Sequence, residues 1–219
     1  MPPDLSGSAS DDLDRADQSF RRELYARVLA CSAQPIDLEA AAYKSLEDAE
    51  AAYDLLAGLE QDGALPVHVQ IVMGVIAGYR GHWAEAEARL QAVVEAQPVA
   101  PLATLCLARI LDYQGQSDDA RATLERLVSV APRVEEARTR LEAHRVRCAG
   151  EAAFLAGDGE GALKLLVQAL ELDPEDALTH NDLGVVMHHL GRPQRARESF
   201  LRSLKLAPAL EDARANLSQ

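Results

Sequence analysis

The sequence predicts an all-α protein built from stacked helix-turn-helix hairpins. Residues of the same type recur at fixed distances from four glycines, which is typical of a repeat architecture. Hydrophobic residues make up 48% of the 219 residues, but aromatic residues only 4%. Such a core must be filled by alanine, leucine and valine, which suit closely packed helices better than a β-sandwich or a barrel.

The repeat is anchored on Gly81, Gly115, Gly157 and Gly191, which are 34, 42 and 34 residues apart. A small residue stands seven positions before each glycine, and an alanine, a large apolar residue and a proline stand five, nine and seventeen positions after it. The small residues are Gly74, Ala108, Gly150 and Gly184, and the alanines are Ala86, Ala120, Ala162 and Ala196. The large apolar residues are Leu90, Leu124, Leu166 and Phe200, and the prolines are Pro98, Pro132, Pro174 and Pro208.

Each position of the repeat has a physical reason. Glycine can adopt the left-handed conformation that ends the first helix, because it has no Cβ atom. The small residues let two antiparallel helices approach closely, and the large apolar residue fills the space between one hairpin and the next. The proline stops the second helix. In the run from Asp173 to Asp176, acidic residues then lie at the start of the next helix, where they favour its positive end.

These residues resemble the tetratricopeptide repeat, a helix-turn-helix unit of about 34 residues. The resemblance implies a right-handed α-solenoid of stacked hairpins. The predicted repeats cover residues 67–100, 101–134, 143–176 and 177–210. A degenerate copy precedes them over residues 33–66, in which Glu47 stands at the position of the turn glycine.

The two ends of the chain are predicted to differ from the repeats. Residues 1–16 are polar and acidic, and we expect them to be disordered. Residues 17–66 are expected to form an N-terminal capping helix and the degenerate repeat. Residues 211–219 begin a further copy and then stop, which predicts a short C-terminal capping helix.

Eight additional residues separate Pro132 from Gly157 relative to the other repeats. No helix-breaking residue interrupts them, so they predict a first helix extended over residues 135–142, by about 12 Å. The extension is compatible with a projecting arm. It is equally compatible with a simple lengthening stabilised by pairing of Glu136 with Arg140.

Composition limits the kinds of partner. The net charge of −13 disfavours a nucleic-acid partner. No stretch is apolar over the roughly 20 residues that a membrane-spanning helix needs, which predicts no membrane insertion. Cys31, Cys106 and Cys148 lack the spacing of a metal site and are expected to be reduced, in a cytoplasmic protein. Arginine outnumbers lysine 19 to 3, which indicates a GC-rich bacterial genome.

No catalytic motif is recognisable in the sequence. His188 and His189 are adjacent, so on a helix they point about 100° apart and cannot chelate a metal as residues four apart can. The sequence therefore predicts no enzyme, no cofactor and no metal site.

The resemblance also implies where a partner would bind. First helices of the family line a concave groove, and fixed offsets from each turn glycine identify the residues that face it. The predicted groove residues are His68, Ile71, Val75, Tyr79, Leu102, Leu105, Arg109, Tyr113, Arg147, Phe154, Asn181, Val185 and His188. The same offsets also give Gly78, Asp112, His144, Glu151, Leu155, Leu178 and His189.

The first half of this groove is apolar and the second half is mixed, which fits an apolar helix or extended segment with a polar flank. The alternative is that the N-terminal helix occupies the groove. One branch of the family grips the acidic C-termini of heat-shock chaperones through cationic and amide side chains. Ile71 and Val75 stand at two of those positions, so we do not expect this role.

The predicted function is that of a non-catalytic scaffold or adaptor, which binds a peptide or helix of a partner protein in the groove. One alternative is a bacterial secretion-type chaperone that holds an apolar segment of a translocated protein. Another is a self-assembling structural subunit of a larger complex, so homo-oligomerisation is left open.

Overall fold

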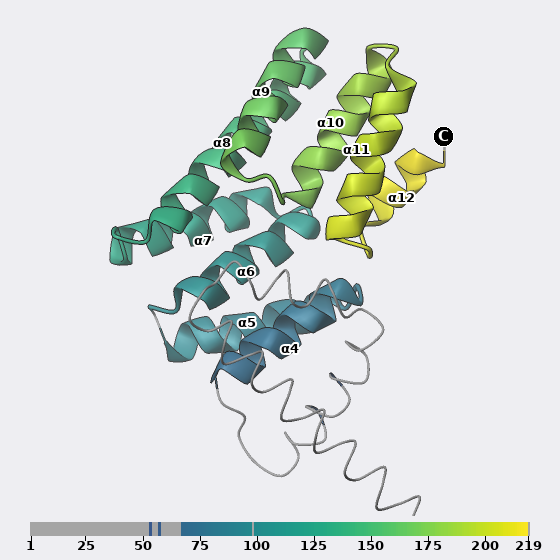
Figure 1. Ribbon diagram of the computed structural model, residues 1–219. Coiled ribbons are helices and arrows are strands. Elements are labelled where there is room, and N and C mark those ends of the chain that lie inside the picture. Colours follow the sequence, from purple (N-terminus) through teal and green to yellow (C-terminus); the bar gives the residue numbers. More distant parts are fainter. Residues whose placement is uncertain (1–52, 54–56, 58–66, 98, 219) are drawn as a thin grey trace, which may run out of the picture. The chain divides into compact units, whose positions relative to one another are not determined.

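The computed structural model describes residues 53, 57, 67–97 and 99–218 (Figure 1). The chain divides into two compact units, Met1–Ile76 and Ala77–Gln219. The predictions of disorder over residues 1–16 and of a cap and a degenerate repeat over residues 17–66 fall almost wholly outside the described residues, as does Cys31. The second unit carries the features discussed below.

Every regular element of the described residues is a helix, which confirms the predicted all-α class. The helices are α4 (Val67–Tyr79), α5 (Trp83–Ala96), α6 (Pro101–Tyr113), α7 (Ser117–Val130), α8 (Glu135–Leu155), α9 (Gly159–Leu172), α10 (Ala177–His189), α11 (Pro193–Leu206) and α12 (Glu211–Leu217). Within the second unit α6 pairs with α7, α8 with α9 and α10 with α11, and α12 packs against α11 (Figure 1). Successive hairpins are stacked, because α7 also packs against α8 and α9 against α10.

The four predicted turn glycines are the described residues with positive φ. Gly81, Gly115, Gly157 and Gly191 have φ angles of 77°, 76°, 87° and 71°. After Gly115 the backbone N–H of Gln116 donates to the carbonyl of Leu111 at 2.9 Å, and the other three turns repeat this bond. It is the bond that closes a helix at a left-handed glycine. One turn geometry therefore recurs along the chain.

The small and large positions of the repeat meet inside the α8–α9 and α10–α11 hairpins. A Cβ atom at Gly150 would lie 3.0 Å from Leu166 Cγ, and one at Gly184 would overlap the Phe200 ring. Leu166 also packs in a cluster with Leu183 of the next hairpin. The large side chains were predicted only between hairpins, whereas Leu166 fills both spaces, because the close approach of α8 and α9 places it at their junction.

The eight additional residues lie in α8, which has 21 residues where α6 and α10 have 13 each. Ala137 is 0% exposed and Leu141 is buried, so the first turns of α8 are packed and do not form a projecting arm. Arg140 and Glu136 form an ion pair at 3.1 Å on this part of the helix.

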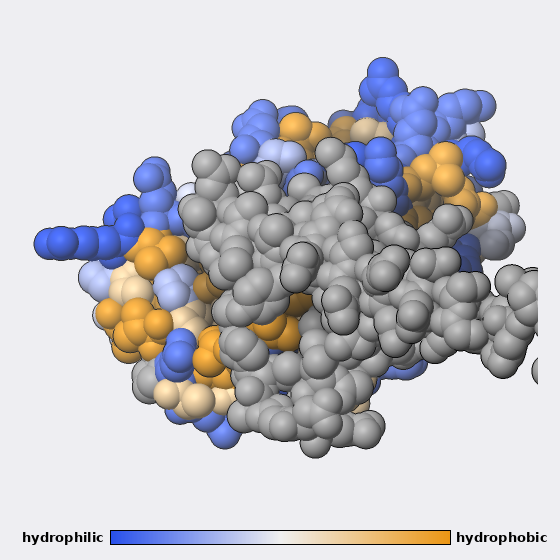
Figure 2. Space-filling view, turned by 60° about the horizontal axis from the view of Figure 1, so that its bottom comes forward, coloured by the Kyte–Doolittle hydropathy of each residue, from blue (hydrophilic) through white to orange (hydrophobic). Residues whose placement is uncertain are grey.

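None of the described helices is long and apolar enough to cross a membrane. Cys106 and Cys148 are free thiols, and Cys106 is buried. Figure 2 shows apolar patches directly beside strongly hydrophilic side chains on the face that it presents.

Candidate functional site

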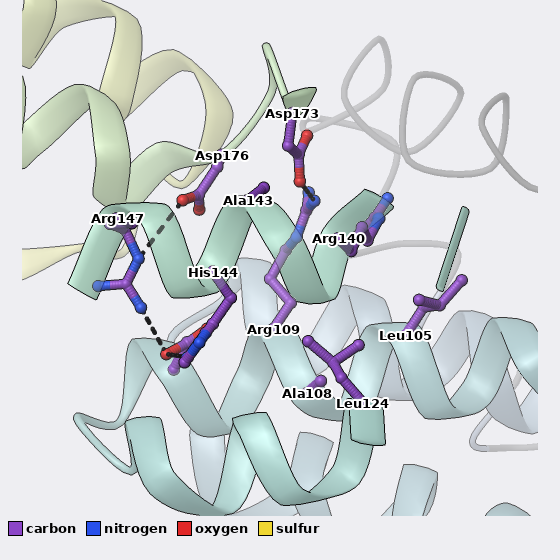
Figure 3. A pocket seen from close by; sticks show the side chains of 11 residues that line it. Leu105, Ala108, Arg109, Leu124, Arg140, Ala143, His144, Arg147, Asp173 and Asp176 are labelled. Carbon is purple, nitrogen blue, oxygen red and sulfur yellow. Dashed lines mark hydrogen bonds and ion pairs between the residues drawn. The ribbon is translucent and has the colours of Figure 1, made fainter. Parts of the chain in front are cut away.

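A small pocket, open to solvent, lies where α6, α8 and the loop between α9 and α10 face one another (Figure 3). Leu105, Ala108, Leu124 and Ala143 form its apolar wall. Its other lining residues are charged or titratable and come from three elements. They are Arg109 and Asp112 of α6, Arg140, His144 and Arg147 of α8, and Asp173 and Asp176 of the loop.

Helical spacing explains why these side chains converge. In α6, Leu105, Arg109 and Asp112 follow one another at intervals of four and three, so they share one face of the helix. In α8, His144 and Arg147 occupy one face in the same way. The two first helices turn these faces toward each other, which concentrates their charges at the pocket.

Arg147 is the centre of the charged side of the pocket and is only 3% exposed. Its Nη2 donates to Asp112 Oδ1 at 2.8 Å, and its Nη1 donates to Glu151. Asp176 Oδ2 lies 3.7 Å from Nε, and Asp182 Oδ2 lies 3.8 Å from Nη1. Burial by itself lowers the pKa of Arg147, but these four carboxyl groups raise it above its ordinary value.

His144 adds a second cation to this network. Its Nε2 lies 3.2 Å from Asp112 Oδ1, and its side chain is buried. Burial lowers the pKa of His144, but the hydrogen bond to Asp112 and the interaction with Cys148 raise it to about 9. The imidazole is therefore protonated at neutral pH. For Asp112, burial raises the pKa, yet His144 and Arg147 bring it below its usual value.

Arg109 connects α6 with the loop between α9 and α10. Its Nη2 donates to Asp173 Oδ2 at 3.0 Å, as Figure 3 shows. The two residues are 64 positions apart in the sequence. Both side chains are largely buried, so this ion pair ties two hairpins together at the rim of the pocket.

Asp182 of α10 stands in a different electrostatic environment. Burial raises the pKa of its carboxyl group well above the usual value; Arg147 opposes this shift, and Glu151 and Asp176 add to it. The Asp182 side chain therefore retains a proton more readily than an ordinary aspartate. The network holds more carboxyl groups than cations.

Three of the predicted groove residues, Leu105, Arg109 and Arg147, line the pocket. Ile71 and Val75 belong to the first compact unit, where Ile71 is buried. The side chain of His68 lies outside the described residues. Of the remaining predicted groove residues, Asn181 is buried, His188 is exposed, and the rest are half-buried, namely Tyr79, Leu102, Tyr113, Phe154 and Val185.

Some predicted groove residues make contacts within the fold. The Tyr113 ring meets the Trp83 ring edge to face, with centroids 5.6 Å apart. The Phe154 ring meets the His189 ring in the same manner at 5.3 Å. Asn181 Oδ1 accepts a hydrogen bond from Asn216 of α12 at 3.0 Å.

Sequence reasoning did not identify the roles of three carboxylates of the network. Asp173 and Asp176 were interpreted only as acids at a helix start, and Asp176 does accept the Thr179 backbone N–H at 3.2 Å as the N-cap of α10. Asp182 lies outside the family's groove offsets. A signal was present in the charged residues that the offsets did give, Arg147 and Glu151, because a buried cation needs partners.

Within the described part of the chain, no group of three or more His, Cys, Asp or Glu side chains is arranged to hold a metal ion.

A family model described as Tetratricopeptide repeat matches residues 71–128 and 149–211. A comparison with curated proteins gave no match.

The chain is similar to several solved structures. One is TTC0263, a thermophilic TPR protein in Thermus thermophilus, with 20% identity, coverage of 84% of this chain and 95% of that one, and a TM-score of 0.46. Another is YrrB, a TPR protein with an unusual peptide-binding site, with 16% identity, coverage of 89% and 98%, and a TM-score of 0.41. The MamA protein has 20% identity, coverage of 69% and 78%, and a TM-score of 0.34.

Proposed function

Because the chain belongs to the tetratricopeptide-repeat family, we propose that it is a non-catalytic scaffold or adaptor that binds a peptide or helix of a partner protein. The binding surface is the face formed by the first helices of the repeats. The observation that carries this proposal is the pocket between α6 and α8, which combines an apolar wall with charged groups. Partner sites of this kind take an apolar anchor and orient it through polar contacts.

A bound segment would lie across the mouth of the pocket, because the residues of its apolar wall, Leu105, Ala108, Leu124 and Ala143, are themselves buried. Its polar groups would face the charged side of the pocket. The half-buried and exposed groove residues, such as Leu102 and Val185, would extend the contact along the first helices. The buried ones, such as Arg147, would hold the surface in shape.

The proposal includes an organisation of the chain and a location. The four repeats at 67–100, 101–134, 143–176 and 177–210 act as the binding array, and residues 211–219 cap its end. The hydrogen bond between Asn216 and Asn181 supports such a cap, because it ties α12 to α10. The free thiols of Cys106 and Cys148 are consistent with a cytoplasmic location.

The introduction of negative charge on two different helix faces tests the proposal. Leu102→Glu combined with Val185→Glu changes two half-buried residues of first helices. Val167→Glu combined with Leu201→Glu makes the same chemical change on second helices, where both residues are exposed. Circular dichroism establishes that each variant is folded before binding is compared.

We expect a partner purified with the wild-type chain from its source organism to lose about tenfold or more in affinity for the first-helix variant. The second-helix variant should bind as the wild type does. Loss of binding in the second-helix variant alone would place the binding surface elsewhere. The partner's identity separates an adaptor from a secretion-type chaperone, which would hold an apolar segment of a translocated protein.

A self-assembling subunit is the second candidate. Leu155 is 86% exposed at the turn between α8 and α9, and Val99 is exposed at the end of another hairpin. Exposed apolar side chains at hairpin ends are compatible with contacts between copies. Sedimentation of the wild type and of Leu155→Ser over a range of concentrations tests this candidate, and a monomer at all concentrations would exclude it.

A further inference from the structure

Helix α11 is basic although the protein as a whole is acidic. The chain has a net charge of −13, yet α11 holds four basic residues and one acid. The other second helices differ, because α5, α7 and α9 each hold more acidic than basic residues. The basic residues of α11 are Arg195, Arg197, Arg202 and Lys205. Their charge is therefore a feature of one helix and not of the repeat.

The four cations of α11 form no ion pair with any acid among the described residues. The single acid of the helix, Glu198, lies three positions after Arg195 and four before Arg202, which places it in one row with them. Arg197 and Lys205 have no acid at either spacing within α11. These two charges are thus the ones that a ligand can neutralise.

Arg197, Leu201 and Lys205 lie along the exposed side of α11, and we call them the α11 stripe. They follow one another at intervals of four, so they share one face and are about 6 Å apart along the helix axis. All three residues are exposed, Leu201 by 47%. Ala196 and Phe200 are buried where α11 packs against its neighbours α10 and α12 (Figure 1). The stripe therefore presents an apolar side chain between two unpaired cations.

The equivalent positions of α9 show what is particular to α11. Val167 stands at the same distance from its turn glycine as Leu201, and it is 42% exposed. The residues four positions before and after it are Leu163 and Glu171. An exposed apolar residue thus occurs at this position in both helices, but only in α11 is it flanked by cations.

We propose that the α11 stripe binds an acidic helix of a partner protein, in which an apolar side chain lies between two aspartate or glutamate side chains. The apolar side chain packs on Leu201, and the two carboxylates pair with Arg197 and Lys205. A partner helix with acids four positions before and after the apolar residue has the same spacing as the stripe, about 6 Å per step.

The negative charge of the whole protein does not prevent this association. At an ionic strength of about 0.15 M, charges are screened over roughly 8 Å. Arg197 and Lys205 are about 12 Å apart along α11, so the screening length is shorter than the stripe itself. A carboxylate that approaches the stripe is therefore governed by the nearest cations and not by distant acids.

A nucleic acid fits the α11 stripe less well than an acidic helix does. Affinity for nucleic acid depends on how many phosphates the protein neutralises, and the stripe offers two cations beside second helices that are acidic. An anionic membrane is also disfavoured, because a membrane-bound helix buries a continuous apolar face. The stripe has a single apolar side chain.

The α11 stripe lies outside the first-helix surface of the proposed function, because α11 is a second helix. A scaffold joins at least two molecules, and the stripe gives this chain a second docking surface. The variant that combines Val167→Glu with Leu201→Glu adds negative charge to the stripe. We expect it to retain the first-helix partner and to lose the acidic helix.

Helical peptides test the proposal. One capped, fluorescently labelled peptide, based on alanine and glutamine, carries a leucine with a glutamate four positions on either side. Its twin carries glutamine at these two places, which removes the charge and keeps the shape. Fluorescence anisotropy at an ionic strength of about 0.15 M measures the affinity of both peptides for the full-length wild type and for two double variants.

The first double variant combines Arg197→Gln with Lys205→Gln and removes both cations of the stripe. The second combines Arg126→Gln with Lys164→Gln. Arg126 and Lys164 are exposed on the second helices α7 and α9 and form no ion pair with a described residue. The second variant therefore matches the first in residue types and in net charge. Circular dichroism checks that both are folded.

We expect the glutamate peptide to bind the wild type at least about threefold more tightly than its glutamine twin, because it forms two ion pairs at a partly exposed surface. The variant without Arg197 and Lys205 should lose this preference. The variant without Arg126 and Lys164 should keep it.

Equal affinity of the two peptides for the wild type would overturn the proposal. A preference that both double variants reduce equally would mean attraction to net charge only, and would also overturn it. If neither peptide binds at concentrations up to about 1 mM, the stripe is rejected as a docking surface for an acidic helix. Tighter binding of duplex RNA or of anionic phospholipid vesicles, lost without Arg197 and Lys205, would assign the stripe to another class of partner. The first-helix surface is tested separately by Leu102→Glu with Val185→Glu, so the proposed function stands or falls independently.

Discussion

Arg147 is a single buried cation on which four acidic side chains depend. Arg147→Met keeps most of the side-chain volume but leaves these acids without their common partner. Breaking a buried charge network in this way typically costs about 3–5 kcal/mol. We expect a loss of about 3 kcal/mol in the free energy of unfolding, measured by urea denaturation at pH 7.

Arg145→Met on the same helix is the control for this prediction. Arg145 pairs with Glu125 at 3.1 Å, but its side chain is half exposed. An exposed ion pair contributes less than about 1 kcal/mol. Equal losses for the two variants would show that the charge of the buried Arg147 contributes no more than that of an exposed ion pair.

His144 makes the stability depend on pH in a defined direction. Its pKa is about 9 in the folded protein because the hydrogen bond to Asp112 outweighs burial, while an unfolded histidine titrates near 6.5. A raised folded pKa contributes stability that is complete below about pH 6.5 and is lost as the pH rises toward 9. The contribution is on the order of 2–3 kcal/mol.

His144→Gln should therefore be less stable than the wild type by the largest amount near pH 6, and the two should converge above about pH 9. Urea denaturation at a series of pH values measures this difference, with Arg147 left intact in both proteins. A difference that does not change between these pH values would mean that the His144–Asp112 pair adds nothing through charge.

At the scale of single elements, the hairpins depend on the absence of a side chain at Gly184. A Cβ atom there would overlap the Phe200 ring, which is buried against α10. Gly184→Ala should destabilise the protein by about 1–3 kcal/mol, as overpacking generally does. Combining it with Phe200→Leu should cost less than the sum of the two single changes, because the smaller side chain makes room. A chemical-denaturation cycle measures the coupling, and strict additivity would contradict the contact.

Features that act within one hairpin could be predicted from the sequence, and features that join hairpins could not. The turn glycines and small residues recur at fixed spacing because each serves a local backbone or packing need, so Gly115 and Gly184 were recognisable by pattern. The family offsets led to Arg147, but its carboxylates come from α6, α8, the N-cap of α10 and α10 itself. Their convergence depends on how the hairpins stack, which no single spacing encodes.

At the scale of the whole repeat unit, the ion pairs of Arg147 affect how cooperatively the hairpins unfold. Stacked repeats touch only their neighbours, so an array can lose a terminal repeat while the others stay folded. The Arg147 network consists of such neighbour contacts, but one side chain of α8 makes them on both sides, to Asp112 of α6 and to Asp182 of α10. The Arg109–Asp173 pair adds a further link, between α6 and the loop that follows α9.

Destabilising the hairpin of α10 and α11 tests whether the ion pairs of Arg147 couple its unfolding to that of α6 and α7. Ala196 is fully buried in α11, and Ala196→Leu should overpack it and destabilise by about 1–3 kcal/mol. Hydrogen exchange followed by mass spectrometry should show faster exchange in α10 and α11 and also in α6 and α7, because the network opens with them. In the Arg147→Met background the added effect of Ala196→Leu should be confined to α10, α11 and α12, since the side chain that links α8 to both of its neighbours is gone. Arg145→Met serves again as the control background and should leave the spread to α6 unchanged. If Ala196→Leu leaves the protection of α6 and α7 untouched in the otherwise wild-type chain, the buried charges stabilise their own surroundings only, and the hairpins unfold as independent neighbours.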